Sequence, residues 1–212
     1  MTEIRIKTLL ALASKLKKAD PRLSSQLKVL AEGALGKQHK PKRIRISTSF
    51  ISALQIIRKK MPRNSYALVG DLAVQCHVPS RSTMDLDFAL ISLSLPQLKK
   101  IFPNGHMGAL VYSVPINGVD VDFLLADDFP WNSEAVSKAQ ISPHIRLPVK
   151  VVQPAYLIIY KLEVGRERDI TDIKNLLRLP GVYKLTEKLV RKYLPELLED
   201  FEQLFRESQF GL

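Results

Sequence analysis

The segment LVGDLAVQCHVPSRSTMDLDFAL, residues 68–90, decides the expected fold. It begins in a short apolar strand, YALV at 66–69, which stops at Gly70 and leads into the helix-like stretch DLAVQCHV. After the polar turn PSRST, the sequence LDFALIS at 86–92 predicts a second strand. This order of elements indicates an α/β (α+β) protein with a mixed sheet flanked by helices.

The sequence on either side of this segment predicts a hairpin and several helices. Asn117–Gly118 separates VYSVPI from VDVDFLL and predicts a hairpin, because a tight turn needs residues that tolerate positive φ. From Pro154 onward the pattern is helical, with PAYLIIYKLEV, ERDITDIKNLLR and two amphipathic stretches. Upstream, Ser47 or Thr48 is expected to cap a helix that ends at Pro62.

The chain of 212 residues is expected to have three regions. Residues 1–46 form a basic helical extension, in which leucines at helical spacing predict a helical hairpin as far as Gly33, followed by a linker to Pro41. Residues 47–153 form the α/β core, and residues 154–212 form a helical C-terminal portion.

Composition excludes several classes of protein. A single cysteine, Cys76, excludes an intrachain disulfide and a cysteine-rich zinc site, so oxygen ligands would have to hold any metal. No apolar run approaches the roughly 18 residues of a membrane span, and the apolar stretch 9–13 is too short for a signal peptide. We therefore expect a cytoplasmic protein with no membrane contact. Phosphate-binding glycine motifs of dinucleotide enzymes and P-loop NTPases are absent from the sequence.

The positive charge of the chain is concentrated in its first third. Residues 1–64 carry 16 Lys and Arg against three acids, a net charge of +13, whereas residues 65–212 have a net charge of −2. The run KQHKPKRIR at 37–45 is the densest part. Such clusters bind phosphate groups by displacing counterions, so RNA is an expected partner of the N-terminal region. A solvated helix face with a basic linker is the alternative.

Two pairs of acids alternate with apolar residues. Asp85 and Asp87 flank Leu86, and a period of two places both carboxylates on one face of a strand, roughly 7 Å apart at the backbone. Asp120 and Asp122 follow the same pattern in the next hairpin. Carboxylates from adjacent strands can hold the pair of divalent cations used in phosphoryl transfer. The alternative is the wet face of a half-exposed sheet.

Residues before the first acidic pair add groups that bind phosphate. Gly70 stands where a strand passes into a helix, and a glycine there lets a phosphate approach the backbone. Arg81, Ser82 and Thr83 precede Asp85 and bring a bidentate cation and two hydroxyl groups.

Three segments together resemble the DNA polymerase beta-like nucleotidyltransferase superfamily. They are LVGDLAVQCHVPSRSTMDLDFAL, then NGVDVDFLL, then LIIYKLEVGRERDITDI, and the resemblance covers roughly residues 47–180. The chain is most similar to the minimal and abortive-infection type members, which serve as toxins of toxin–antitoxin pairs. The resemblance identifies residues 47–153 as a nucleotidyltransferase core.

The resemblance implies a magnesium-dependent transferase. Asp85 and Asp87 match the metal-binding pair, and Asp122 matches the third acid, with Asp120 in reserve. The implied reaction moves a nucleoside monophosphate from an NTP to an acceptor hydroxyl with Mg²⁺ or Mn²⁺ present. RNA, for instance a tRNA 3′ end, is the expected acceptor, and an antitoxin protein is a further implied partner.

The implied nucleotide-binding residues lie before and after the acids. They are Gly70, Asp71, Arg81, Thr83 and Lys161, with Arg168 as a secondary candidate. Lys161, Arg166, Arg168, Asp169 and Asp172 follow the spacing of a lysine and an R-x-R-D motif in toxin-like members. For Asp169 and Asp172 we expect a structural role.

Asp71 departs from the family pattern, which has glycine or serine at this position. An ionised acid beside a triphosphate would repel it. The alternatives are that Asp71 points away as a helix cap, helps to hold a cation, or marks a non-catalytic binding module for nucleic acid or a partner protein. Besides a transferase and a binding module, a third interpretation of the function is a metal-dependent nuclease, which would use the same acids without an NTP.

Overall fold

The computed structural model describes residues 46–125 and 128–209, together with residues 11, 12, 14, 15, 17 and 44. The chain divides into two compact units, Met1–Lys42 and Arg43–Leu212. In the first unit, residues 11, 12, 14 and 15 are helical, and the rest of the expected helical hairpin and linker lies outside the described residues. The boundary at residue 42 is close to the expected one at 46, and the second unit contains both the sheet and the C-terminal helices.

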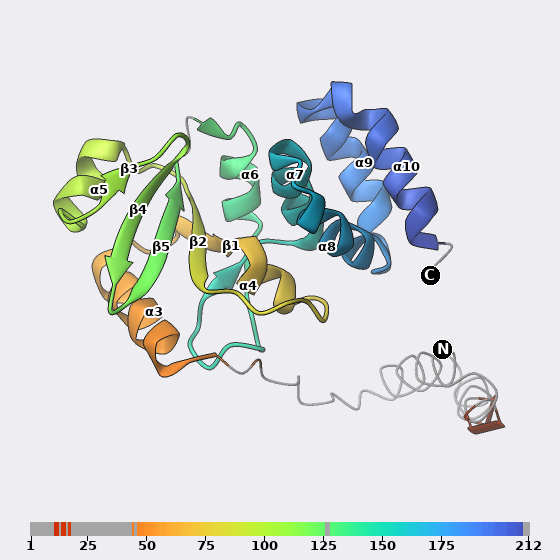
Figure 1. Cartoon of the computed structure of the whole chain (residues 1–212), viewed down its shortest axis with the longest axis horizontal. Helices are drawn as coiled ribbons and strands as arrows, with labels where there is room; N and C mark the ends of the chain where they lie inside the picture. Colours follow the sequence, from red (N-terminus) through yellow and green to blue (C-terminus); the bar gives the residue numbers. More distant parts are fainter. Residues whose placement is uncertain are drawn as a thin grey trace. The chain divides into compact units, whose positions relative to one another are not determined.

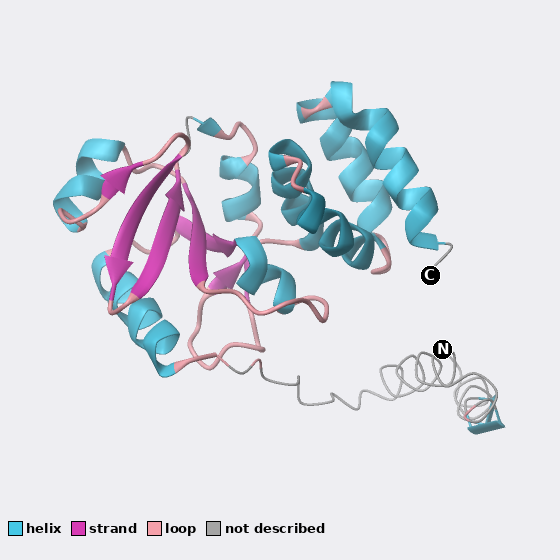
Figure 2. Cartoon of the chain, in the orientation of Figure 1, coloured by secondary structure: helices cyan, strands magenta, loops and turns pink. Residues whose placement is uncertain are grey.

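The second unit is built on a seven-stranded mixed sheet, which confirms the expected α/β class (Figure 2). Its strand order is β3-β4-β5-β2-β1-β7-β6. The strands are β1 (Tyr66–Val69), β2 (Asp85–Leu90), β3 (His106–Met107), β4 (Val111–Ile116), β5 (Val119–Leu124), β6 (Gln140–Ile141) and β7 (Lys150–Val151). β1 runs antiparallel to β2 and parallel to β7, and β2 runs parallel to β5.

The predicted hairpin is present between β4 and β5. Asn117 and Gly118 have φ values of 51° and 75°, the left-handed conformations that a two-residue turn requires. The turn also sets the register, so that Ser113 lies opposite Asp122. Because side chains alternate, Phe123 points to the opposite face, where it stacks on Phe88 and Phe102 at 6.0 and 5.4 Å between ring centroids. One face of β2 and β5 is therefore apolar core, and the other carries the acids.

Helices surround this sheet (Figure 1). They are α3 (Thr48–Lys60), α4 (Gly70–Gln75), α5 (Leu95–Ile101), α6 (Asn132–Ser137), α7 (Pro154–Val164), α8 (Glu167–Leu177), α9 (Val182–Tyr193), the short 3₁₀ helix η2 (Pro195–Leu197) and α10 (Leu198–Gln209). The side chain of Ser47 accepts a hydrogen bond from the backbone N–H of Phe50, so Ser47 is the predicted cap of α3. In the described part of the chain, no helix is both long and apolar enough to cross a bilayer.

The C-terminal helices bring their charged residues to the sheet through α7. This helix contacts α4, α8 and α9, and eight consecutive residues of it, Ala155–Leu162, are buried. α7 ends at Gly165 in the left-handed conformation, with φ 64°, which allows the chain to turn directly into α8. This turn places Lys161 of α7 beside Asp169 and Asp172 of α8 and beside Asp71 of α4.

Candidate active site

The predicted acids of β2 and β5 lie side by side. Because the two strands are parallel and in register, Asp85 is paired with Asp120 and Asp87 with Asp122. Asp85, Asp87 and Asp122 line one pocket of about 290 Å³ together with Gly70. All three carboxylates are half-buried in this pocket.

Hydroxyl groups orient two of these carboxylates. Ser113 Oγ on β4 donates to Asp122 Oδ1 at 2.6 Å, and Thr83 Oγ1 donates to Asp85 Oδ1. Each hydrogen bond occupies one lone pair of its carboxylate and leaves others for a cation. Thr83 therefore orients the carboxylate of Asp85. Ser113 is a site residue that the sequence pattern did not identify.

The third carboxylate is packed against the backbone at Gly70. A Cβ atom at this glycine would overlap Oδ2 of Asp87, and Gly70 has a φ of 64°. No side chain fits there, and the conformation favours glycine. Gly70 thus makes room for the Asp87 carboxylate, a role that differs from the expected approach of a phosphate to the backbone.

Asp87 has an unusual protonation equilibrium. Burial, followed by the neighbouring carboxylates of Asp85, Asp122 and Asp71, raises its pKa to about 7, while the Arg166 guanidinium opposes the shift. Like charges this close favour either a proton or a bound cation. The donor set, with carboxylate oxygens from Asp85, Asp87 and Asp122, is the kind that Mg²⁺ prefers.

The reserve candidate lies outside this pocket. Asp120 is exposed, and it does not belong to the residues that line the pocket. It shares a strand face with Asp122 but lies two residues before it, beside Asp85. Asp120 and Asp122 are thus a matched pair of aspartates on one strand, of which only Asp122 lines the pocket.

A second charged cluster, centred on Lys161, adjoins the acid site. Lys161 Nζ donates to Asp169 at 2.6 Å, to Asp172 at 2.9 Å and to Asp71 at 3.0 Å. Burial alone would lower the pKa of Lys161, but these three hydrogen bonds raise it above its ordinary value. Lys161 is 5% exposed, so its ammonium group is buried and fully charged.

Two arginines complete this Lys161 cluster. Arg81 Nη2 lies 2.5 Å from Asp71 Oδ2, and Arg166 Nε donates to Asp169 Oδ2 at 2.7 Å. Ser80 Oγ donates to Asp172 Oδ1 at 2.6 Å. Three carboxylates are therefore balanced by three cations, and the charge of Asp71 is paired within the protein. Asp169 and Asp172 have the structural environment expected of them.

The same three acids have the spacing of a metal site. One carboxylate oxygen from each of Asp71, Asp169 and Asp172 lies within 4.8 Å of the others, and such a buried group could bind a metal ion. Lys161 Nζ lies within 3.0 Å of all three, however, and takes the position of a cation. Within the described ranges 46–125 and 128–209, the oxygens of Asp85, Asp87 and Asp122 are not all this close to one another. Acids that together hold two cations do not all have to converge on one ion.

Further pocket residues come from the α7–α8 turn and from two loops. Arg166, with 47% of its side chain exposed, and Arg168 supply positive charge, while Leu110, Phe129 and Val164 supply apolar surface. Arg168 was predicted as a secondary candidate. Leu110 and Val164 carry no sequence signal for a site, because single exposed aliphatic side chains are common on protein surfaces, and Phe129 is buried like an ordinary core residue.

No protein-family model matches the chain, and a comparison with curated proteins found no match. The geometry and the chemistry of the pocket are therefore what indicates a function.

Proposed function

We propose that the protein is a divalent-metal-dependent nucleotidyltransferase, which moves a nucleoside monophosphate from an NTP to an acceptor hydroxyl. The observation that carries the proposal is the in-register pairing of Asp87 with Asp122, in one pocket with Asp85 and Arg166. Adjacent carboxylates on parallel strands beside a guanidinium group suit a substrate that combines a triphosphate with divalent cations. The resemblance of residues 47–180 to nucleotidyltransferases supports the same reaction.

In the proposed reaction, the acceptor oxygen attacks the α-phosphorus of the NTP. The bond between the α-phosphorus and the bridging oxygen breaks, pyrophosphate leaves, and Asp122 takes the proton of the attacking hydroxyl. Asp85, Asp87 and Asp122 would hold Mg²⁺ or Mn²⁺, which when bound supplies positive charge that offsets the charge developing on the phosphoryl group.

The cations of the site divide into two roles under this proposal. Arg166 and Arg168 line the pocket and are exposed, so we assign contacts with the triphosphate to them. Lys161 already holds three carboxylates, and Arg81 holds Asp71. These two act as positioning residues, which fix the turn at Arg166 against helix α4. The ion pairs of Asp71 with Arg81 and Lys161 offset its charge, which supports the catalytic alternative over a non-catalytic binding module.

RNA is the proposed acceptor, for instance a tRNA 3′ end, because of the +13 charge of residues 1–64. A toxin of a toxin–antitoxin pair is the biological setting that the resemblance implies. In that setting, expression in a bacterial host should arrest growth, and the Asp85→Asn/Asp87→Asn variant should not. An antitoxin would be the partner protein that relieves the arrest.

The direct test incubates the protein with Mg²⁺, each α-labelled NTP in turn and total tRNA. We expect label on RNA with the parent chain and none with Asp122→Asn, while the matched variant Asp120→Asn keeps the activity. Label on the protein itself would keep the chemistry and change the acceptor. RNA that is shortened without an NTP would indicate a nuclease instead. No label with correctly folded protein would overturn the proposal in favour of a binding module.

A further inference from the structure

A basic pocket lies at the other end of strand β1 from the acids. Arg58, Arg63, Asn64, Tyr66, Ile141, Pro148, Val149 and Lys150 line a cavity of about 390 Å³. Its walls come from the last turn of α3, the loop that follows it, and the β6–β7 hairpin. Tyr66 begins β1, whereas Gly70, which lies against Asp87, follows the end of the same strand. This pocket is therefore separate from the acidic site.

The three cations of this pocket have no acidic partner in the part of the chain that the structure describes. No described residue forms an ion pair or a side-chain hydrogen bond with Arg58, Arg63 or Lys150. This contrasts with Arg81, Arg166 and Lys161, each of which is paired with at least one carboxylate. Arg58 and Arg63 are exposed and Lys150 is half-buried, so all three can reach a ligand in solution.

The sequence explains why the pocket is so free of acids. The lining residues lie in two stretches of the sequence, residues 46–70 and 135–162, that contain no Asp or Glu at all. Between them they carry the cluster Arg58-Lys59-Lys60 and also Arg146. Unopposed positive charge over two long segments attracts an anion with many charges rather than a single ion.

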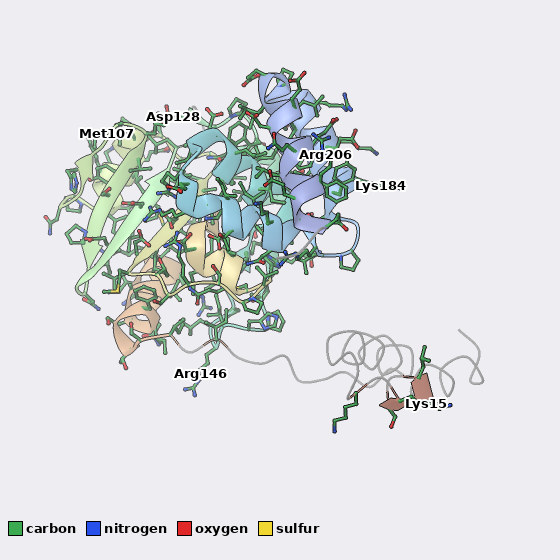
Figure 3. The ribbon with its side chains drawn as sticks, turned by 45° about the vertical axis from the view of Figure 1, so that its right-hand side comes forward. Lys15, Met107, Asp128, Arg146, Lys184 and Arg206 are labelled. Atoms are coloured by element: carbon green, nitrogen blue, oxygen red, sulfur yellow. The ribbon has the colours of Figure 1, made fainter. Side chains whose placement is uncertain are left out.

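A backbone hydrogen bond joins residue 44 to the loop beside this pocket. Ile44, which lies between Arg43 and Arg45 in the sequence, donates its N–H to the carbonyl of His144 at 3.0 Å. His144 belongs to the loop that joins β6 to β7, two strands that line the pocket. Arg146, in the same loop, is exposed and extends away from the body of the second unit (Figure 3). Arg146 thus adds positive charge beside the cavity.

We infer that this basic pocket binds the phosphate backbone of a nucleic-acid strand. Guanidinium groups form paired hydrogen bonds to phosphate oxygens, and a lysine ammonium adds a point charge. Tyr66 presents a half-buried ring in the same cavity, next to the two types of cation. A polymer with one charge per nucleotide matches a pocket whose charge continues into the segments beside it. The choice of RNA follows the proposed function, but binding here does not require transfer.

The test measures RNA binding by the full chain without NTP or metal. A fluorescein-labelled single-stranded RNA of about 20 nucleotides, longer than a typical single-strand site, is titrated at several salt concentrations with the triple variant Arg58→Gln/Arg63→Gln/Lys150→Gln. We expect binding to weaken roughly tenfold, and the slope of log Kd against log salt to fall by about 2, since three phosphate contacts are lost. A matched variant, Lys184→Gln/Lys188→Gln/Arg206→Gln, removes three exposed cations of α9 and α10 and should leave both values unchanged; Figure 3 labels Lys184 and Arg206.

Two results would overturn the inference. In one, the pocket variant does not lose RNA affinity relative to the control variant, either because it binds RNA as tightly as the parent chain or because the control variant loses as much affinity as the pocket variant. In the other, a polyglutamate peptide competes for the pocket as well as RNA of equal charge, which would assign it to an acidic protein segment. Photocrosslinking of a 4-thiouridine RNA provides an independent measurement, with cross-links expected on Tyr66 and its neighbours. Because no NTP or metal is present, failure here leaves the proposed transferase untouched.

Discussion

Gly70 and Asp87 are in direct contact across the strand pair β1–β2: the glycine has no side chain, and the Asp87 carboxylate occupies the position where a Cβ would lie. β1 and β2 are antiparallel here, with Val69 opposite Asp87, so that α4 begins directly beside the acid. The geometry of the site therefore depends on a residue that offers no functional group of its own.

Gly70→Ala should remove the metal-dependent activity as well as stability. The new methyl group must displace Asp87, and the residue must keep a φ of 64°, so we expect a loss of about 3 kcal/mol. Gly118→Ala is a matched control, because Gly118 also has positive φ, 75°, but a methyl group there would meet nothing within 4 Å. That variant should lose about 1 kcal/mol and keep its activity. Equal effects of the two substitutions in urea unfolding and NTP binding would contradict this account.

Lys161→Met should destabilise the protein by about 3–5 kcal/mol, since it leaves Asp71, Asp169 and Asp172 buried without their central cation. The loss should depend on pH. Hydrogen bonds from Lys161 and Arg166 outweigh burial and hold the pKa of Asp169 below its ordinary value, so the stabilisation is present at neutral pH and disappears in acid.

Chemical denaturation at about pH 3 and about pH 7, on either side of the ordinary pKa of an aspartate, measures this dependence, and the gap between parent and Lys161→Met should be wider at pH 7. Adding Asp172→Asn to Lys161→Met should recover part of the stability, because one buried charge is removed. If Asp172→Asn lowers the stability of Lys161→Met by as much as it lowers that of the parent chain, the two substitutions are additive and the cluster does not act as a unit.

Asp87 should make the metal-free protein less stable as the pH rises. Its pKa is raised to about 7 by burial and by Asp85, Asp122 and Asp71, against about 4 in an unfolded chain. Between these values the folded state binds more protons than the unfolded state, so the free energy of unfolding falls with increasing pH. Asp87→Asn should therefore be more stable than the parent at pH 8 in EDTA, by about 1–3 kcal/mol, and similar to it at pH 5.

The same experiment with 5–10 mM Mg²⁺ (roughly a saturating range for weak carboxylate sites) should raise the melting temperature of the parent at pH 8 but not that of Asp87→Asn. Asp120→Asn serves as the control, because this exposed acid lies outside the pocket. A magnesium response that survives Asp87→Asn and disappears in Asp120→Asn would move the metal site to the solvent-facing end of the strands.

Local patterns were sufficient for much of the fold. Asn117–Gly118 predicted the hairpin because its backbone conformation is determined within two residues, and the helix over Pro154–Val164 was predicted from the helical pattern of its sequence. The alternation of Asp85 and Asp87 with apolar neighbours likewise predicted their shared face. The two-residue strands β6 and β7 were not predicted, because so short a strand forms only through its partner; β7 pairs with β1 through Leu68 and Val151.

The site was harder to predict where it depends on contacts between distant segments. Lys161 was expected to meet a triphosphate, but its position relative to Asp71 depends on how α7 packs on α4, which the spacing of residues in one sequence does not specify. The same holds for Ser113, whose hydroxyl becomes relevant only through the β4–β5 register that places it opposite Asp122. Residue types indicated the chemistry, whereas the assignment of partners required the fold.

The role of Asn132 also depends on contacts between distant segments. It binds β2 and β5 at their C-terminal ends, away from the acids of the pocket. Its side-chain amide is fully buried and donates to the carbonyls of Leu90, Leu124 and Leu125 at 3.2–3.3 Å, while its Oδ1 accepts from the Tyr160 hydroxyl. It thereby joins the ends of β2 and β5 to helix α7. Asn132→Ala should cost about 2–4 kcal/mol, because three buried carbonyls and one hydroxyl lose their partner.

Asn132→Asp distinguishes the contribution of the hydrogen bonds to stability from the contribution of the side-chain volume. The carboxylate has the same shape but no N–H groups, and at neutral pH it places a negative charge against the three carbonyls. We expect it to be more destabilising than Asn132→Ala at pH 8, and to recover at pH 4, where a protonated carboxyl can donate one hydrogen bond. Urea unfolding at both pH values measures this. Equal stability of the two variants at pH 8 would mean that Asn132 only fills space.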